Sequence, residues 1–211
     1  METAMAMAGA YLLGSLPPAV WISKYAFGSD IRTHGSGNAG STNMYRVFGF
    51  KAGLATQLLD VLKGWLAAML PVWFLPFDNA ETLTVQQLLC GAAAVVGHVY
   101  TVFAGFKGGK GVNTILGMML AVAPGACGVG VGVFLLVLLA FKMVSLASMI
   151  AVGSFPVYVF LTDAENRVLL ITGVVLFFYI VFTHRANIRR ILAGNESKVN
   201  LIAKLRGKAK K

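Results

Sequence analysis

The sequence predicts an all-α integral membrane protein that forms a single domain over residues 1–211. Of its 211 residues, 57% are hydrophobic and only 12% are charged, whereas an average soluble domain is about 25% charged. Apolar runs of the length that a membrane helix needs, about 20 residues, recur along the whole chain. This composition excludes a soluble globular domain, a disordered chain, a coiled coil and a disulfide scaffold.

Five apolar runs are each long enough to cross a membrane once: 4–23, 52–77, 83–104, 143–162 and 167–183. A further stretch, residues 112–141, contains no charged residue and is interrupted by Pro124 and Gly125. Because proline breaks the interior of a helix, we expect two helices in this stretch. The sequence therefore predicts seven transmembrane helices.

The distribution of lysine and arginine predicts the orientation in the membrane. Glu2 precedes the first apolar run and Lys24, the first cation, follows it. Because cytoplasmic loops carry the excess of Lys and Arg, we expect the N-terminus outside and the C-terminus in the cytoplasm. Most of the net charge of +10 then faces the cytoplasm, including a basic tail over residues 198–211. This pattern favours contact of the tail with anionic lipid headgroups over nucleic-acid binding.

The first polar segment is the loop 28–46, with the sequence GSDIRTHGSGNAGSTNMYR. Glycines let backbone N–H groups face a ligand, while Ser, Thr and Asn add short donors. Arg32 and Arg46 add guanidinium groups that bind phosphate well. The pattern favours a phosphate-binding loop; the alternative is a solvated loop of turn residues.

The second polar segment is residues 105–111, GFKGGKG, directly before an expected helix. A glycine-rich turn at a helix N-terminus binds phosphate through backbone N–H groups and the helix dipole. Lys107 and Lys110 add cations. The nucleotide-binding P-loop has Ser or Thr where Gly111 stands here, so an ATPase is excluded.

The third segment, residues 183–196, follows the last apolar run with the sequence THRANIRRILAGNE. His184 and Asn187 are three residues apart and are expected to share a helix face. Histidine is the side chain best suited to proton transfer near neutral pH. The arginines are explained equally well as a positive-inside signal.

Three smaller features accompany these segments. Asp60 and Lys63 lie three residues apart within an apolar run, and we expect a structural ion pair, since charges in lipid are costly unless paired. The alternative for this pair is a proton relay. His98 is expected to be a core histidine or one that supports the site. Ser145 and Ser148 share one helix face, from which they bind another helix or a ligand.

These segments favour two classes of protein: an enzyme that joins a soluble phosphate compound to an acyl or lipid group, or a small transporter of an organic phosphate. The sequence lacks the His-x4-Asp pair of common acyltransferases and any clustered carboxylates that would hold Mg²⁺. We therefore expect chemistry without a metal ion or a cofactor.

The residues also resemble a known family. The segments SGNAGSTNMYR, LLDVLKG, GHVY, FKGGKGV, SLAS and HRANIRRILAGNE, in this order, are similar to those of the bacterial acyl-phosphate:glycerol-3-phosphate acyltransferases of the integral-membrane PlsY type. The resemblance implies transfer of a fatty acyl group from acyl phosphate to the sn-1 hydroxyl of glycerol 3-phosphate, the first acylation of phospholipid synthesis. Its implied partners are those two substrates and membrane lipid, in a bacterial inner membrane with the active site facing the cytoplasm.

The resemblance also implies roles for individual residues. It assigns glycerol 3-phosphate to Arg46 and the acyl phosphate to the GGKG loop, and leaves the proton acceptor open between His184 and a substrate phosphate. One departure is Thr183, where an arginine is usual. The expected catalytic residues are Ser36, Arg46, Lys110, His184 and Asn187. The expected substrate-binding residues are Asn38, Thr42, Asn43, Gly108, Gly109, Gly111, Ser148 and Arg185. Asp60, Lys63 and Glu196 are expected to be structural.

Overall fold

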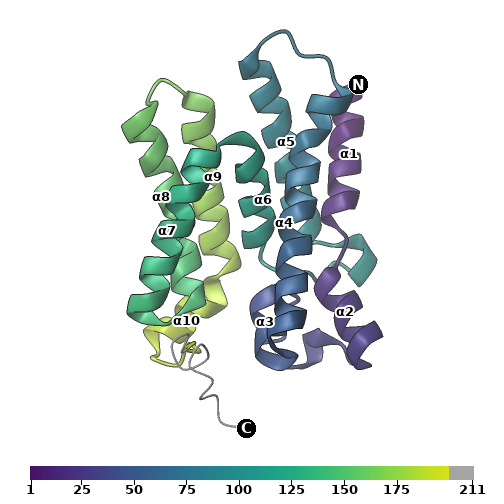
Figure 1. Ribbon diagram of the computed structural model, residues 1–211, viewed down its shortest axis with the longest axis vertical. Coiled ribbons are helices and arrows are strands. Elements are labelled where there is room, and N and C mark those ends of the chain that lie inside the picture. Colours follow the sequence, from purple (N-terminus) through teal and green to yellow (C-terminus); the bar gives the residue numbers. More distant parts are fainter. Residues whose placement is uncertain (200–211) are drawn as a thin grey trace. The chain divides into compact units, whose positions relative to one another are not determined.

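The computed structural model describes residues 1–199, and every regular element in that range is a helix (Figure 1). The predicted all-α fold is thus confirmed for this part of the chain. The basic tail lies almost entirely in residues 200–211, outside the described range. The chain divides into two compact units, one of residues 1–124 and one that begins at Gly125.

Within residues 1–199, four segments are long and apolar enough to cross a membrane: Glu2–Phe27, Ala80–Ala104, Pro124–Phe141 and Val144–Thr162. A fifth is formed by Arg167–Thr183 and Arg185–Leu192 if this pair, bent by 64°, counts as one span. The multi-pass helical class therefore holds, and the number of seven crossings stays a prediction.

The first unit is arranged around one long helix. Its helices are α1 (Glu2–Gly14), α2 (Pro18–Phe27), α3 (Ser41–Val47), α4 (Gly49–Phe74), α5 (Ala80–Val99) and α6 (Val112–Val122), with single 3₁₀ turns η1 (Ile31–Thr33) and η2 (Val102–Ala104). Helix α4 packs against α1, α5 and α6. In this unit α2 and α3 lie at the end remote from the N-terminus (Figure 1).

The first apolar run is interrupted in a way that the sequence analysis did not expect. Instead of one helix over 4–23, α1 ends at Gly14 and α2 begins at Pro18. Proline is favoured at the first position of a helix because the N–H it lacks has no partner there. The hydroxyl of Thr101 donates a hydrogen bond to the carbonyl of Ser15, which satisfies part of the freed backbone.

The helices of the first unit approach one another closely at glycines. A Cβ atom on Gly117 of α6 would collide with the backbone carbonyl of Val61 on α4, and one on Gly64 of α4 would collide with the backbone of Thr114 on α6. Small residues at helix contacts are typical of membrane helices, where backbones pack closely without a hydrophobic driving force.

The second unit contains α7 (Pro124–Phe141), α8 (Val144–Thr162), α9 (Arg167–Thr183) and α10 (Arg185–Leu192). The break that Pro124 predicts is confirmed, because Ala123 separates α6 from α7. Helix α8 packs against α9, and α10 lies at the end of this unit opposite the α8–α9 connection (Figure 1). The chain bends by 64° between α9 and α10. His184 occupies this bend, rather than a continuous helix face shared with Asn187 as expected.

The close approach of α4 and α6 makes a testable prediction. Gly117→Ala adds a methyl group against immovable backbone and should destabilise the protein by about 1–3 kcal/mol. The matched control is Gly9→Ala in α1, where a Cβ meets nothing within 4 Å. It should be neutral or slightly stabilising. Melting temperatures in detergent report both, and equal values for the two variants would contradict the packing.

Candidate active site

The buried side chain of Asn43 organises the first polar loop. Its Nδ2 donates to the carbonyls of His34 at 2.9 Å, Asn38 at 3.1 Å and Ile31 at 3.2 Å. Its Oδ1 accepts the backbone N–H of Ser36 at 3.0 Å. One amide therefore satisfies backbone groups along most of the loop, which has little regular structure of its own.

Ser36 and Arg46 are held at the surface of this arrangement. Both residues are exposed, and Arg46 contacts the Oδ1 of Asn43 through a long hydrogen bond of 3.4 Å. Thr42 lies in the first turn of α3 next to Asn43. The loop thus fixes the backbone near Ser36 and presents a guanidinium group beside it.

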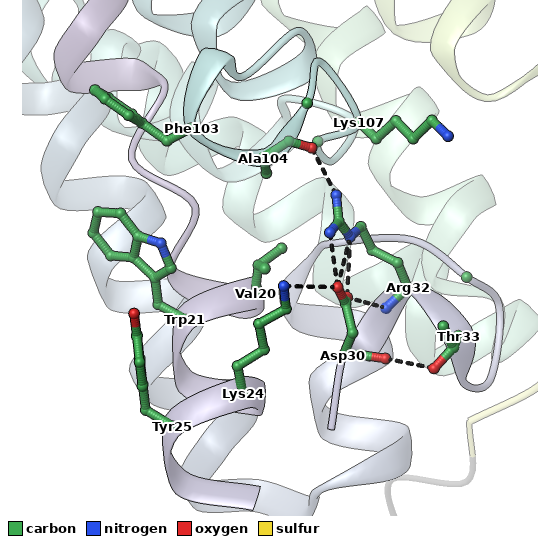
Figure 2. Close-up of a pocket in the computed structure, with 13 residues that line it drawn as sticks. Val20, Trp21, Lys24, Tyr25, Asp30, Arg32, Thr33, Phe103, Ala104 and Lys107 are labelled. Carbon is green, nitrogen blue, oxygen red and sulfur yellow. Dashed lines mark hydrogen bonds and ion pairs between the residues drawn. The ribbon is translucent and has the colours of Figure 1, made fainter. Parts of the chain in front are cut away.

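A cavity of about 870 Å³ lies in the same unit, between α2, the first loop and the turn that follows α5 (Figure 2). Gly37 and Gly108 line it, whereas Ser36, Arg46 and Lys110 do not. The cavity therefore includes one expected substrate-binding residue, Gly108, and none of these three expected catalytic residues.

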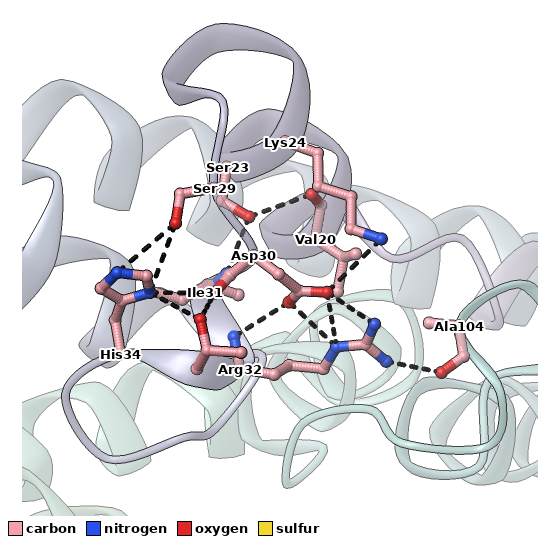
Figure 3. Close-up of polar contacts among 10 residues, drawn as sticks. Val20, Ser23, Lys24, Ser29, Asp30, Ile31, Arg32, His34 and Ala104 are labelled. Carbon is pink, nitrogen blue, oxygen red and sulfur yellow. Dashed lines mark hydrogen bonds and ion pairs between the residues drawn. The ribbon is translucent and has the colours of Figure 1, made fainter.

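Asp30 forms an ion-pair cluster that the sequence analysis missed (Figure 3). Its carboxylate binds the Nε of Arg32 at 3.0 Å and a terminal nitrogen of Arg32 at 2.7 Å, and the ammonium of Lys24 lies at 3.4 Å. The other terminal nitrogen of Arg32 donates to the carbonyl of Ala104 at 2.7 Å. Hydrogen bonds from Arg32 hold the pKa of the Asp30 carboxyl well below its usual range. Arg32 thus joins the first polar loop to η2, directly before the second loop.

The glycines of the second loop are used for packing against α5. The N–H groups of Gly108 and Gly109 donate to the carbonyls of Val99 at 3.0 Å and His98 at 3.2 Å. A Cβ on Gly108 would collide with the carbonyl oxygen of His98. These two N–H groups therefore do not face a ligand, in contrast to the expectation for the whole loop. Gly111, with a φ of 89°, caps α6, whose first-turn N–H groups lack helical acceptors.

A buried polar cluster lies behind this loop. Asp60 is 1% exposed, and its Oδ1 lies 2.8 Å from the Nζ of Lys63 and 3.3 Å from the Nδ1 of His98. Lys63 also donates to the carbonyl of Leu16 at 2.7 Å. The Nε2 of His98 faces Gly109 so closely that a Cβ there would collide with it. The structure thus places the predicted Asp60–Lys63 pair and His98 together, against the second loop.

In the second unit, the carboxylate of Glu196 gathers residues from three segments. Its Oε1 accepts from Ser145 at 2.7 Å and from Asn187 at 2.6 Å, and its Oε2 accepts from Arg190 at 2.7 Å. Burial by itself would raise the pKa of this carboxyl, but the three hydrogen bonds outweigh it and hold the pKa below its usual value. Ser145 and Arg190 were not singled out for this role from the sequence.

His184 is buried at the bend between α9 and α10, where its Nδ1 lies 2.9 Å from the carbonyl of Ile180. Because a carbonyl oxygen can only accept, Nδ1 carries the proton and Nε2 is the basic nitrogen. Ser148 donates to the carbonyl of Val144 within its own helix at 2.9 Å. Arg185 is exposed, with its guanidinium 4.7 Å from the centre of the Phe182 ring.

The structure thus brings the predicted residues together in two groups. Residues of the first two polar loops are connected within the first unit, and Asn187 is joined to Glu196 within the second. Across residues 1–199, no three or more His, Cys, Asp or Glu side chains are grouped closely enough to hold a metal ion.

Apolar helices joined by glycine-rich, cation-bearing loops define the chain as a multi-pass membrane protein. The sequence matches the glycerol-3-phosphate acyltransferase family over residues 4–194, so the chain belongs to this family and is an acyltransferase. The glycerol-3-phosphate acyltransferase of Chlorobium phaeobacteroides (strain BS1) is 42% identical, with 92% of this chain and 94% of that protein covered. That of Chlorobaculum tepidum is 39% identical, with 90% and 94% covered.

Two crystal structures of PlsY (YgiH), an integral membrane glycerol 3-phosphate acyltransferase, are also similar to this chain. The glycerol 3-phosphate form has a TM-score of 0.85 and 37% identity, and covers 97% of this chain and 99% of its own. The lysophosphatidic acid form has a TM-score of 0.82 and 35% identity, with 96% and 97% covered. The resemblance seen in the sequence is therefore confirmed at the level of the family.

The Glu196 network makes a prediction about pH. A carboxyl whose pKa is lowered in the folded state stabilises the protein above its unfolded pKa, and loses this effect as the pH falls through the folded pKa. Glu196→Gln should therefore lower stability at pH 7 by about 1.5–3 kcal/mol, the usual contribution of hydrogen bonds to a charged group. When the pH falls from 7 to 4, the variant should lose less further stability than the parent protein does.

Melting curves in detergent at the two pH values measure this effect. The control is Glu165→Gln, which changes an exposed carboxyl in the α8–α9 connection and should leave both curves unchanged. Identical melting temperatures for Glu196→Gln and the parent protein at pH 7 would argue against the network.

Proposed function

We propose that this protein transfers a fatty acyl group from acyl phosphate to the sn-1 hydroxyl of glycerol 3-phosphate, releasing lysophosphatidic acid and inorganic phosphate. The observation that carries this proposal is the family match over residues 4–194. It is supported by the similarity to PlsY structures described as glycerol 3-phosphate and lysophosphatidic acid forms. Both substrates carry phosphate, which suits a protein with more than one cationic loop.

Arg46 binds the phosphate of glycerol 3-phosphate in this proposal. Arg46 is exposed and contacts Asn43 through a long hydrogen bond, so its planar guanidinium can take a phosphate through two hydrogen bonds. Ser36 lies on the same loop and orients the acceptor or stabilises the oxyanion. Asn43, together with Asn38 and Thr42, shapes the backbone around it.

Lys110 and the start of α6 bind the acyl phosphate. The first-turn N–H groups of α6 and its dipole favour an anion at this point. Lys110 immediately precedes Gly111, the N-cap of this helix, so its ammonium adds positive charge next to the same end. The packing of Gly108 and Gly109 against α5 fixes this geometry before substrate binds, as electrostatic catalysis requires.

The chemical step needs neither a metal ion nor a covalent intermediate, because acyl phosphate is already activated. The hydroxyl oxygen of glycerol 3-phosphate attacks the acyl carbonyl carbon, and the carbon–oxygen bond to phosphate breaks. Phosphate leaves with the electron pair. The hydroxyl proton passes to the Nε2 of His184 or to a substrate phosphate, whose second pKa lies near 6. Asn187, Arg185 and Ser148 contribute polar contacts to substrate.

The setting of this reaction is part of the proposal. Seven transmembrane helices with the N-terminus outside would place the polar loops at the cytoplasmic face of a bacterial inner membrane, where soluble glycerol 3-phosphate is available. The four or five apolar spans of the described residues support a multi-pass arrangement. The excess of Lys and Arg in the polar loops supports this orientation.

Purified protein in detergent tests the donor directly. With glycerol 3-phosphate present, palmitoyl phosphate should give equimolar phosphate and lysophosphatidic acid, and palmitoyl-CoA should give neither. Activity should survive EDTA. Product from the thioester alone would overturn the donor, and loss in EDTA that Mg²⁺ restores would overturn the metal-free step. No product from either donor would overturn the proposal.

Two substitutions separate the proposed roles of the loops. Arg46→Ala should lower kcat/KM for glycerol 3-phosphate on the order of 10- to 100-fold, the loss expected for hydrogen bonds to a charged group. Lys110→Ala should instead raise the KM for acyl phosphate most. Lys51→Ala, at an exposed lysine of α4, is the control and should change neither constant. The reverse pattern of KM effects would exchange the two assignments.

A further inference from the structure

We propose that the cavity of the first unit is a binding site for an anionic glycerophospholipid of the surrounding bilayer, separate from Ser36, Arg46 and Lys110. Three features support this: the lining of the cavity, the residual charge of the Asp30 cluster, and the position of two of the three lining segments at the ends of apolar spans. Lipid binding here does not depend on which acyl donor the enzyme uses.

The cavity has the size of a ligand site. Its volume of about 870 Å³ falls within the range of about 300–1,000 Å³ that is typical of small-molecule pockets. Its lining comes from α2, from residues 30–37 and from residues 103–108. Because Ser36, Arg46 and Lys110 do not line it, the proposed reaction leaves this cavity without a function.

One side of the cavity is aromatic. Trp21, Tyr25 and Phe103 lie together on this side in Figure 2, and the rings of Trp21 and Phe103 are 6.5 Å apart. Their exposed fractions are 39%, 86% and 51%, which is high for large aromatic side chains. Exposed Trp and Tyr are typical of the membrane–water boundary, where an apolar ring and a polar tip are both accommodated.

The opposite side is cationic. It carries Lys24, Arg32 and Lys107 with a single carboxylate, that of Asp30. The Lys24 side chain is 50% exposed although it pairs with Asp30, and the Lys107 residue is exposed. Three cations against one carboxylate leave an excess of positive charge, to which the phosphate of a lipid headgroup is complementary.

Two of the three lining segments lie at the ends of apolar spans. Lys24 and Tyr25 lie near the end of the span Glu2–Phe27, and Lys107 comes three residues after the span Ala80–Ala104. Segments that leave the hydrocarbon layer at its edge lie at the level of lipid headgroups. A soluble phosphate compound would cover only the cationic side, whereas the glycerol and upper acyl chains of a lipid also cover the aromatic side.

Fluorescence of Trp21 offers a direct measurement. In the full-length protein, Trp65→Phe and Trp73→Phe leave Trp21 as the only tryptophan. Mixed micelles then contain either brominated phosphatidylglycerol or brominated phosphatidylcholine, since bromine quenches tryptophan on contact. We expect phosphatidylglycerol to quench Trp21 at several-fold lower mole fraction than phosphatidylcholine does.

Charge variants in the same background test the cationic side. Lys24→Gln with Lys107→Gln should weaken the preference for phosphatidylglycerol on the order of tenfold, as expected for the loss of two basic residues near a lipid surface. The matched control is Lys51→Gln, an exposed lysine of the same unit that does not line the cavity. If the double variant does not fold, Lys107→Gln alone serves instead, because it leaves both ion pairs of Asp30 intact. This single variant should still weaken part of the preference for phosphatidylglycerol.

Three results would overturn the proposal. Equal quenching by the two lipids would show that Trp21 meets only bulk lipid or detergent. A preference that survives the double substitution would place the anion elsewhere. Displacement of phosphatidylglycerol by glycerol 3-phosphate or inorganic phosphate at substrate concentrations would assign the cavity to a soluble phosphate, and displacement by lysophosphatidic acid alone would assign it to the product.

Discussion

The arrangement of the first unit depends on the buried carboxylate of Asp60. A charge within a membrane helix is costly unless it is paired, and Asp60 is paired with Lys63 of its own helix and with His98 of α5. Lys63 in turn donates to the carbonyl of Leu16, in the break between α1 and α2. Three segments far apart in the sequence are therefore held by one cluster. The ring of His98 also lies against Gly109, and the carbonyl of His98 accepts the N–H of Gly109. This cluster therefore sets the position of the GGKG loop.

The polar loops are then built outward from this fixed point. The second loop is attached to the end of α5 through Gly108 and Gly109. Arg32 attaches the first loop to Ala104, directly before the second loop. Within the first loop, Asn43 supplies the backbone with the hydrogen bonds that regular structure would otherwise provide. Loops rich in glycine lose much conformational entropy on ordering, so side-chain contacts of this kind are needed to hold them in one conformation before substrate binds.

Several of these features could be predicted from the sequence and others could not. The helical class, the break at Pro124 and the pairing of Asp60 with Lys63 follow from composition, from proline chemistry and from a spacing of three residues within one helix.

The break before Pro18 was missed because hydrophobicity continues across it. The network of Glu196 joins Ser145 to a residue 51 positions later, and such a separation leaves no periodic signal. The roles of Gly108 and Gly109 depend on tertiary contacts with His98, which no local motif contains.

The two arginines of the first loop show why such contacts matter for function. Residue type and spacing alone make Arg32 and Arg46 equivalent phosphate ligands. In the structure, Arg32 uses its Nε and both terminal nitrogens on Asp30 and Ala104, so its guanidinium is committed mainly to joining the two loops. Arg46 makes one long contact with Asn43 and is exposed. A guanidinium binds phosphate most strongly when two parallel N–H groups are available. The same fold that fixes Arg32 therefore leaves Arg46 as the better-placed arginine for a substrate phosphate.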